Sequence, residues 1–187
     1  MKKISLLLLA LIFSFSIQAQ TEQEARDLLD QYAEIFETEQ WLKSLDLTYP
    51  DLFTVVPREQ MEQVIEATFN SNMFEMSMGG MEIQEISERF EEEGLSYRFM
   101  KYKQEMKMTV NESSQVTVDA LVGPMKAQFG EDNVSVSGSS LEILANNKLA
   151  VIKKDGDDQV YGLEIKNELK GLMGNFMSET FIERAFK

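Results

Sequence analysis

Two stretches within residues 74–108 alternate apolar and polar side chains, which is the pattern of strands that bury one face. The apolar residues keep one parity as far as Met78 and take the opposite parity from Met81. Gly79-Gly80 separates the two runs, and two glycines at a change of parity predict a β-bulge or bend in one long strand. This feature constrains the fold most, because a long strand with one apolar face needs both a partner strand and a cover.

The partner strand is predicted to follow a turn at residues 91–94, Glu-Glu-Glu-Gly. Leu95, Tyr97 and Phe99 share one parity, whereas the apolar residues from Met100 onward share the other. A second bulge near Phe99 would reconcile the two runs. The charged residues between them are expected to face water, which makes an antiparallel hairpin with one wet face: Lys101, Lys103, Glu105 and Lys107.

Helical spacing of apolar residues marks the segments that could cover this hairpin. An amphipathic helix is predicted from Thr21 to about Leu45, and Gly123-Pro124 is expected to kink a later helix or delay its start. The other predicted segments are a helix after Pro57, a helix over 117–129, a helical tail over 169–186, strands near 134–137, 141–153 and 160–165, and turns at 146–147 and 155–158.

This order of elements predicts an α+β fold, in which helices cover one face of a curved, cone-like antiparallel sheet. No internal repeat or linker divides the chain, and residues 20–187 are enough for one domain with its own core. We therefore expect a single α+β domain over residues 20–187.

The first residues have the three parts of a cleavable export signal. Lys2 and Lys3 precede an apolar run over residues 4–17, which is followed by Gln18-Ala19-Gln20. The run is shorter than the roughly 20 residues that a membrane-spanning helix needs. We expect residues 1–19 to be a signal peptide, the mature chain to lack a membrane span, and the protein to be periplasmic or extracellular.

The sequence contains neither cysteine nor histidine. This composition excludes disulfides, Cys–His and Ser-His-Asp catalytic sites, and the usual zinc, haem and iron–sulfur ligands. The expected domain is therefore stabilised by packing alone, and we predict no cofactor.

Acidic residues are concentrated in the first half of the mature chain. Residues 20–93 contain 19 Asp and Glu against 4 Lys and Arg, a net charge of −15, whereas residues 94–187 contain 13 against 12, a net charge of −1. This distribution argues against nucleic acid and anionic lipid as partners. Solubility explains it most simply, and a basic protein partner is the alternative.

Two helices interrupted at Tyr49-Pro50-Asp51 and followed by long bent strands resemble the α+β cone of the ketosteroid-isomerase and SnoaL-like superfamily. The helix that ends at Phe129-Gly130, followed by Asn133-Val134, also resembles small secreted proteins of unassigned role from Bacteroidota. Either resemblance implies a cone-shaped cavity between sheet and helices. The catalytic Asp and Tyr of the isomerases have no matching positions in this sequence.

Methionine and tyrosine are concentrated on the two long strands. Thioether side chains adapt to irregular spaces, so these residues could form a hydrophobic core or line a pocket for an apolar ligand, and soft sulfur ligands could also hold Cu(I). We predict no metal site and select six candidate lining residues of a binding pocket: Met76, Met78, Tyr97, Tyr102, Met106 and Met108.

These patterns favour an exported, non-enzymatic domain that binds an apolar or amphipathic small molecule, or a protein partner. Two alternatives remain open from the sequence. One is an enzyme of the cone superfamily that uses a carboxylate and a tyrosine in a buried pocket. The other is an acidic interaction protein of the envelope.

Overall fold

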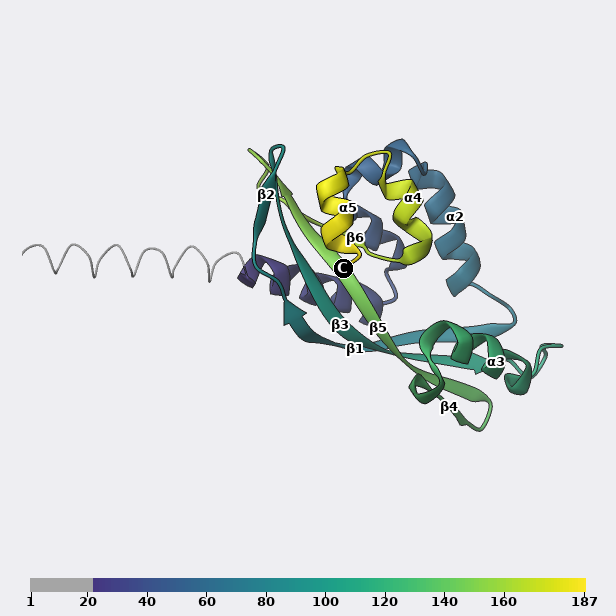
Figure 1. Ribbon diagram of the computed structural model, residues 1–187. Coiled ribbons are helices and arrows are strands. Elements are labelled where there is room, and N and C mark those ends of the chain that lie inside the picture. Colours follow the sequence, from purple (N-terminus) through teal and green to yellow (C-terminus); the bar gives the residue numbers. More distant parts are fainter. Residues whose placement is uncertain (1–21) are drawn as a thin grey trace, which may run out of the picture.

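The computed structural model describes residues 22–187, so the expected signal peptide lies outside the described residues. Six strands form one open antiparallel sheet in the order β1-β3-β5-β4, with β2 paired to β3 and β6 paired to β5. Figure 1 shows the three longest strands running side by side as a twisted ribbon. The strands are β1 (Phe74–Ile86), β2 (Phe90–Glu92), β3 (Leu95–Val110), β4 (Val134–Ser137), β5 (Ser140–Lys154) and β6 (Val160–Glu164).

Helices precede, interrupt and follow the strands. The chain is helical over 22–37, and the 3-10 helices η1 and η2 connect this N-terminal helix to α2. In residues 22–187 no helix is long and apolar enough to cross a membrane. The elements are η1 (Trp41–Asp46), η2 (Pro50–Thr54), α2 (Arg58–Phe69), α3 (Val118–Phe129), η3 (Glu131–Asn133), η4 (Asn167–Leu169), α4 (Lys170–Met173) and α5 (Glu179–Ala185).

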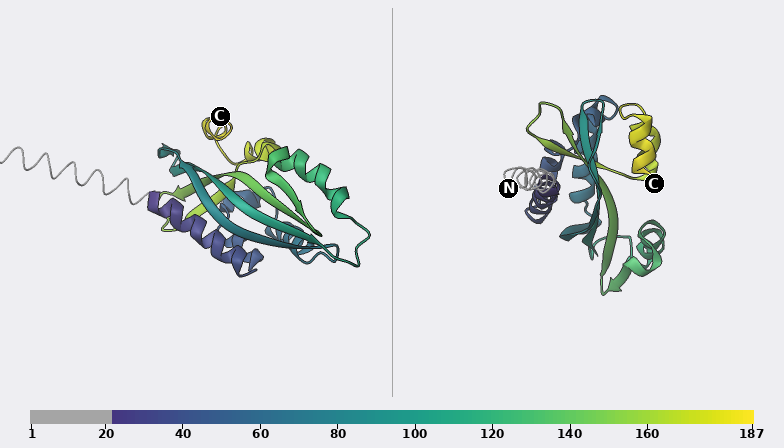
Figure 2. Two further views of the ribbon diagram at one scale, coloured as in Figure 1. Left: turned by 90° about the horizontal axis from the view of Figure 1, so that it is seen from below. Right: turned by 60° about the vertical axis from the view of Figure 1, so that its left-hand side comes forward.

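The predicted single-domain α+β fold with an antiparallel sheet is confirmed, but helices lie on both faces of the sheet. At one end of β3, Tyr97 and Phe99 pack with Phe181 of α5, whereas Met100, the next residue after Phe99, packs with Leu28 of the N-terminal helix on the other face. Figure 2 shows the N-terminal helix and the C-terminal helices on opposite sides of the strands. Side chains on both faces of β3 are therefore buried at this end.

The register of β1 confirms the bulge predicted at Gly79-Gly80, because the pairing with β3 shifts between Met78 and Met81. The second predicted bulge, near Phe99, is wrong. β3 pairs with β5 without a shift, and the second irregularity lies in β1 between Ile83 and Glu85. The change of parity near Phe99 instead reflects burial of both faces of β3.

The first helix differs from the sequence prediction in its extent, whereas the helix predicted over 117–129 forms as α3. The first helix does not continue to Leu45, because Glu39 has a positive φ of 55° and a new 3-10 helix begins at Trp41. Helix α3 begins at Val118 and contains Pro124, and the Thr117 side chain caps it by accepting a hydrogen bond from the Ala120 backbone.

We predict that Phe181→Ala lowers the free energy of unfolding by about 3–5 kcal/mol. Phe181 is 1% exposed, and its ring centroid lies 4.9 Å from that of Tyr97 and 5.5 Å from that of Phe99. Urea unfolding followed by circular dichroism measures the change. Val64→Ala, at a position 60% exposed on α2, is the control and should stay within about 0.5 kcal/mol of the parent. A loss below about 1 kcal/mol for Phe181→Ala would contradict the assigned core.

Candidate ligand cavity

One face of the sheet carries two hydrophobic clusters with a gap between them. Met100 and Tyr102 of β3 pack with the N-terminal helix, and Met108, further along the same face, packs beneath α3. Gln104 lies between these clusters at an inward position and is 5% exposed. A carboxamide in the middle of an apolar strand face interrupts the hydrophobic packing.

A cavity of about 320 Å³ occupies this gap. The sheet forms its floor, and the N-terminal helix, η1 and α2 form its walls. The volume is at the lower end of the range for small-molecule pockets, which is about 300–1,000 Å³. The lining includes Tyr32, Phe36, Thr48, Met61, Ile65, Met78, Tyr102, Gln104, Met106, Phe129, Ala145, Asn147, Leu149, Gly162, Glu164, Lys166 and Leu169.

The register of the strands orders the cavity floor from an apolar end to a polar end. Met78 pairs with Met106 at the apolar end, which Phe129 also lines. Gln104 is the next residue after Met106 on the same face of β3, in the direction of Tyr102. Its Nε2 donates a hydrogen bond to the Met78 sulfur at 3.4 Å. Tyr102, which pairs with Asn147, follows Gln104 at the polar end.

Tyr32 reaches the polar end from the N-terminal helix because Gly162 leaves room for it. A Cβ atom built at Gly162 would lie 2.7 Å from the Tyr32 hydroxyl oxygen and 3.0 Å from a ring carbon. Thr48 forms an isolated bridge with Gly162 along the outer side of β6 and also lines the cavity. Because Gly162 has no side chain, the Tyr32 hydroxyl can lie against β6 at the cavity wall.

Both cavity tyrosines are held in the neutral form. Burial raises the pKa of Tyr32 above its usual range, and the negative charge of Glu164 adds to the rise. A side-chain hydrogen bond with Thr48 lowers the pKa, but by less than burial raises it. Burial likewise raises the pKa of Tyr102, and Glu164 is the next largest cause. The two hydroxyls are consequently neutral hydrogen-bonding groups at physiological pH.

Glu164 and Lys166 lie at the border of the polar end. The Lys166 Nζ is 3.0 Å from a Glu164 carboxylate oxygen, and the side chains are 50% and 39% exposed, respectively. Elsewhere in residues 22–187, no three carboxylates come together in a group that could hold a metal ion.

Helix α2 covers the cavity without burying any of its own side chains. Its main neighbour is η1, where Trp41 stacks on Phe69 with ring centroids 4.0 Å apart and planes inclined by 7°. Met61 and Ile65 of α2 line the cavity. The helix thus presents an apolar stripe to a space that protein side chains fill only in part.

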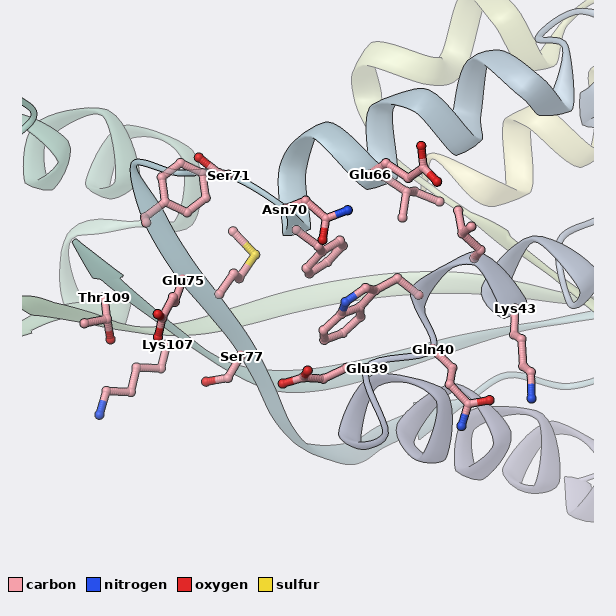
Figure 3. Close-up of a pocket in the computed structure, with 16 residues that line it drawn as sticks. Glu39, Gln40, Lys43, Glu66, Asn70, Ser71, Glu75, Ser77, Lys107 and Thr109 are labelled. Carbon is pink, nitrogen blue, oxygen red and sulfur yellow. The ribbon is translucent and has the colours of Figure 1, made fainter. Parts of the chain in front are cut away.

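A second and larger hollow, about 800 Å³, lies on the other side of this wall. Figure 3 shows polar side chains around it, including Glu39, Asn70 and Ser77. Acidic and basic side chains both line it, and the rings of Trp41 and Phe69 stack on each other. It is a polar surface cleft, whereas the smaller cavity combines apolar walls with a few convergent polar groups.

The structure brings three of the six candidate residues together. Met78, Tyr102 and Met106 line the cavity. Met76 lies beside the surface cleft and packs under α3, where Met108 is buried. Tyr97 is in the core on the opposite face, against α5.

Four further lining residues were not predicted from the sequence: Tyr32, Gln104, Asn147 and Glu164. Gln104 had a visible signal, because it is a polar residue at an apolar position of the β3 alternation. Asn146-Asn147, expected to be a turn, lies within an uninterrupted β5. Asn147 therefore faces Tyr102 across the sheet.

We predict that Gly162→Ala lowers the free energy of unfolding by about 1–3 kcal/mol, because the new methyl group overlaps the Tyr32 ring. Equilibrium unfolding in urea measures this cost. In a Tyr32→Ala background the same substitution should cost less, since the ring is gone, and a double-mutant cycle isolates the difference. An equal cost in both backgrounds would contradict the described contact.

Comparison with known proteins gives no match to this chain. No protein-family model matches it, no curated protein is similar, and no solved structure matches the fold.

Proposed function

We propose that this protein is an exported, non-enzymatic binding protein that holds an apolar or amphipathic small molecule in the cavity beneath α2. One observation carries the proposal: a single sheet face is packed at both ends and leaves a space of about 320 Å³ at Gln104. A space of this size, lined by adaptable methionines, supports a binding role.

The distribution of polar groups supports an amphipathic ligand. Met78, Met106 and Phe129 provide an apolar end, whereas Tyr32 and Tyr102 provide hydroxyls at the other. A ligand with one apolar and one polar part would satisfy both ends in one orientation. Few, well-placed polar groups in a mostly apolar pocket fix the orientation of small molecules.

Helix α2 is the part of the wall best suited to admit a ligand. None of its side chains is fully buried, so moving it away from the sheet would expose half-buried contacts, among them the Trp41–Phe69 stack and the packing of Met61. A bound ligand would bury the cavity-facing sides of Met61 and Ile65, contributing about 25 cal/mol for each Å² of apolar surface. Binding would therefore stabilise the closed position of α2.

The alternative of a carboxylate–tyrosine enzyme receives less support. The carboxylate at the cavity, Glu164, is paired with Lys166 and is 39% exposed. The raised pKa values of Tyr32 and Tyr102 keep both hydroxyls protonated, so neither is an effective base near neutral pH. Hydrogen bonding by neutral groups favours binding over acid–base catalysis.

We predict that Met78→Glu lowers the affinity for the neutral apolar dye N-phenylnaphthylamine at least about tenfold while the chain remains folded. Met78 is half-buried at the cavity and belongs to none of the three hydrophobic clusters. A carboxylate there opposes apolar contact with the dye. Dye fluorescence measures binding, and circular dichroism monitors folding.

Met108→Glu is the matched comparison, because Met108 lies on the paired strand but is 6% exposed within the core. This substitution should unfold or strongly destabilise the chain, since it buries a carboxylate without a partner. If Met78→Glu also unfolds the protein, Met78 is a core residue. Unchanged dye binding by folded Met78→Glu would count against the cavity as the binding site.

A further inference from the structure

We propose that the polar end of the ligand is an uncharged hydroxyl, ester or amide group, and that carboxylates, phosphates and ammonium groups are selected against. This inference rests on the proposed binding function and specifies the class of molecule that the same cavity accepts. Its basis is the set of side chains that the fold gathers at the polar end.

The hydrogen-bonding groups there are hydroxyls and carboxamides. Tyr32, Thr48, Tyr102, Gln104 and Asn147 come from four different segments of the chain and all line the cavity. Each of these side chains both donates and accepts hydrogen bonds. Such a set can hydrogen-bond to a ligand hydroxyl, which both donates and accepts. It can also donate to a ligand carbonyl oxygen, which only accepts.

The two charged side chains at the cavity border pair with each other, and the charge of Glu164 still acts on the tyrosine hydroxyls. In the described part of the chain, the charged lining residues are Glu164 and Lys166, and they form an ion pair with a 3.0 Å separation. Lys166 is therefore not a free cation for a ligand anion, and Glu164 is not a free anion for a ligand cation. Any ionic ligand would have to break this pair or remain buried without a counter-charge, which is unfavourable.

Glu164 further disfavours an anion at the tyrosine hydroxyls. Its charge contributes to the raised pKa of both Tyr32 and Tyr102, which places both hydroxyls within its electrostatic influence. A ligand carboxylate bound by these hydroxyls would experience the same repulsion. The two tyrosines together with Glu164 therefore discriminate between an alcohol and an acid of the same chain length.

The volume limits the size of the ligand. Taking about 30 Å³ for a water molecule in the liquid, a space of about 320 Å³ accommodates roughly ten to twelve non-hydrogen atoms. Decanol, decanoate and decylammonium fall in this range and differ only in the terminal group. They provide a matched neutral, anionic and cationic series.

The test measures displacement of N-phenylnaphthylamine from the full mature chain by these three molecules at neutral pH. We expect decanol to bind at least about tenfold more tightly than decanoate or decylammonium. Glu164→Gln should raise the affinity for decanoate and so lower the ratio of decanol affinity to decanoate affinity, because it removes the repelling carboxylate. Glu85→Gln is the control, since Glu85 is also a strand carboxylate paired with a lysine, Lys101, but lies outside the cavity lining. It should leave the ratio unchanged.

The possible failures are distinguishable. If the dye binds and decanoate or decylammonium displaces it as well as decanol does, the inference is overturned while the proposed binding function stands. Dye binding that decanol does not displace also overturns the inference. If neither the dye nor any of the three molecules binds, as judged also by native mass spectrometry, the proposed function fails and the inference fails with it.

Discussion

The uninterrupted pairing of β3 with β5 fixes which side chains lie on each face at the centre of the sheet. Fifteen residue pairs, from Leu95 opposite Lys154 to Thr109 opposite Ser140, keep one register without a bulge. A slip of one residue would turn the two faces of one strand over relative to the other strand. The register therefore decides that Met100, Tyr102, Gln104 and Met106 follow one another on a single face, and that the carboxamide lies between two apolar clusters.

Most of the fold could be predicted from the spacing of apolar residues. The long hairpin, the bulge at Gly79-Gly80 and the order of helices and strands all left periodic signals in the sequence. The reversal of parity near Phe99 was misinterpreted because a strand buried on both faces has no polar side to mark its orientation. Asn146-Asn147 was misinterpreted because turn-forming residues can lie within a strand when neighbouring strands pair with them.

The cavity could be predicted only in part, because its residues come from distant segments. Met78, Tyr102 and Met106 were identifiable from their alternation, but the same alternation also selected Met108, which α3 buries. Which inward positions are covered depends on where the helices pack. The contact between Tyr32 and Gly162 joins segments 130 positions apart and leaves no periodic trace in either.

The position of β1 at the end of the strand order has a consequence for solubility. Within the described sheet β1 pairs with β3 alone, so its outer backbone groups could recruit another strand. Glu75, Glu82 and Glu85 lie along this edge, and two bulges distort it. Edge-to-edge growth would bring these carboxylates together, and at neutral pH their repulsion opposes it. Near the isoelectric point of about 4.5 the net charge of the chain approaches zero, so the repulsion between whole molecules falls and association of the exposed edges would be least opposed.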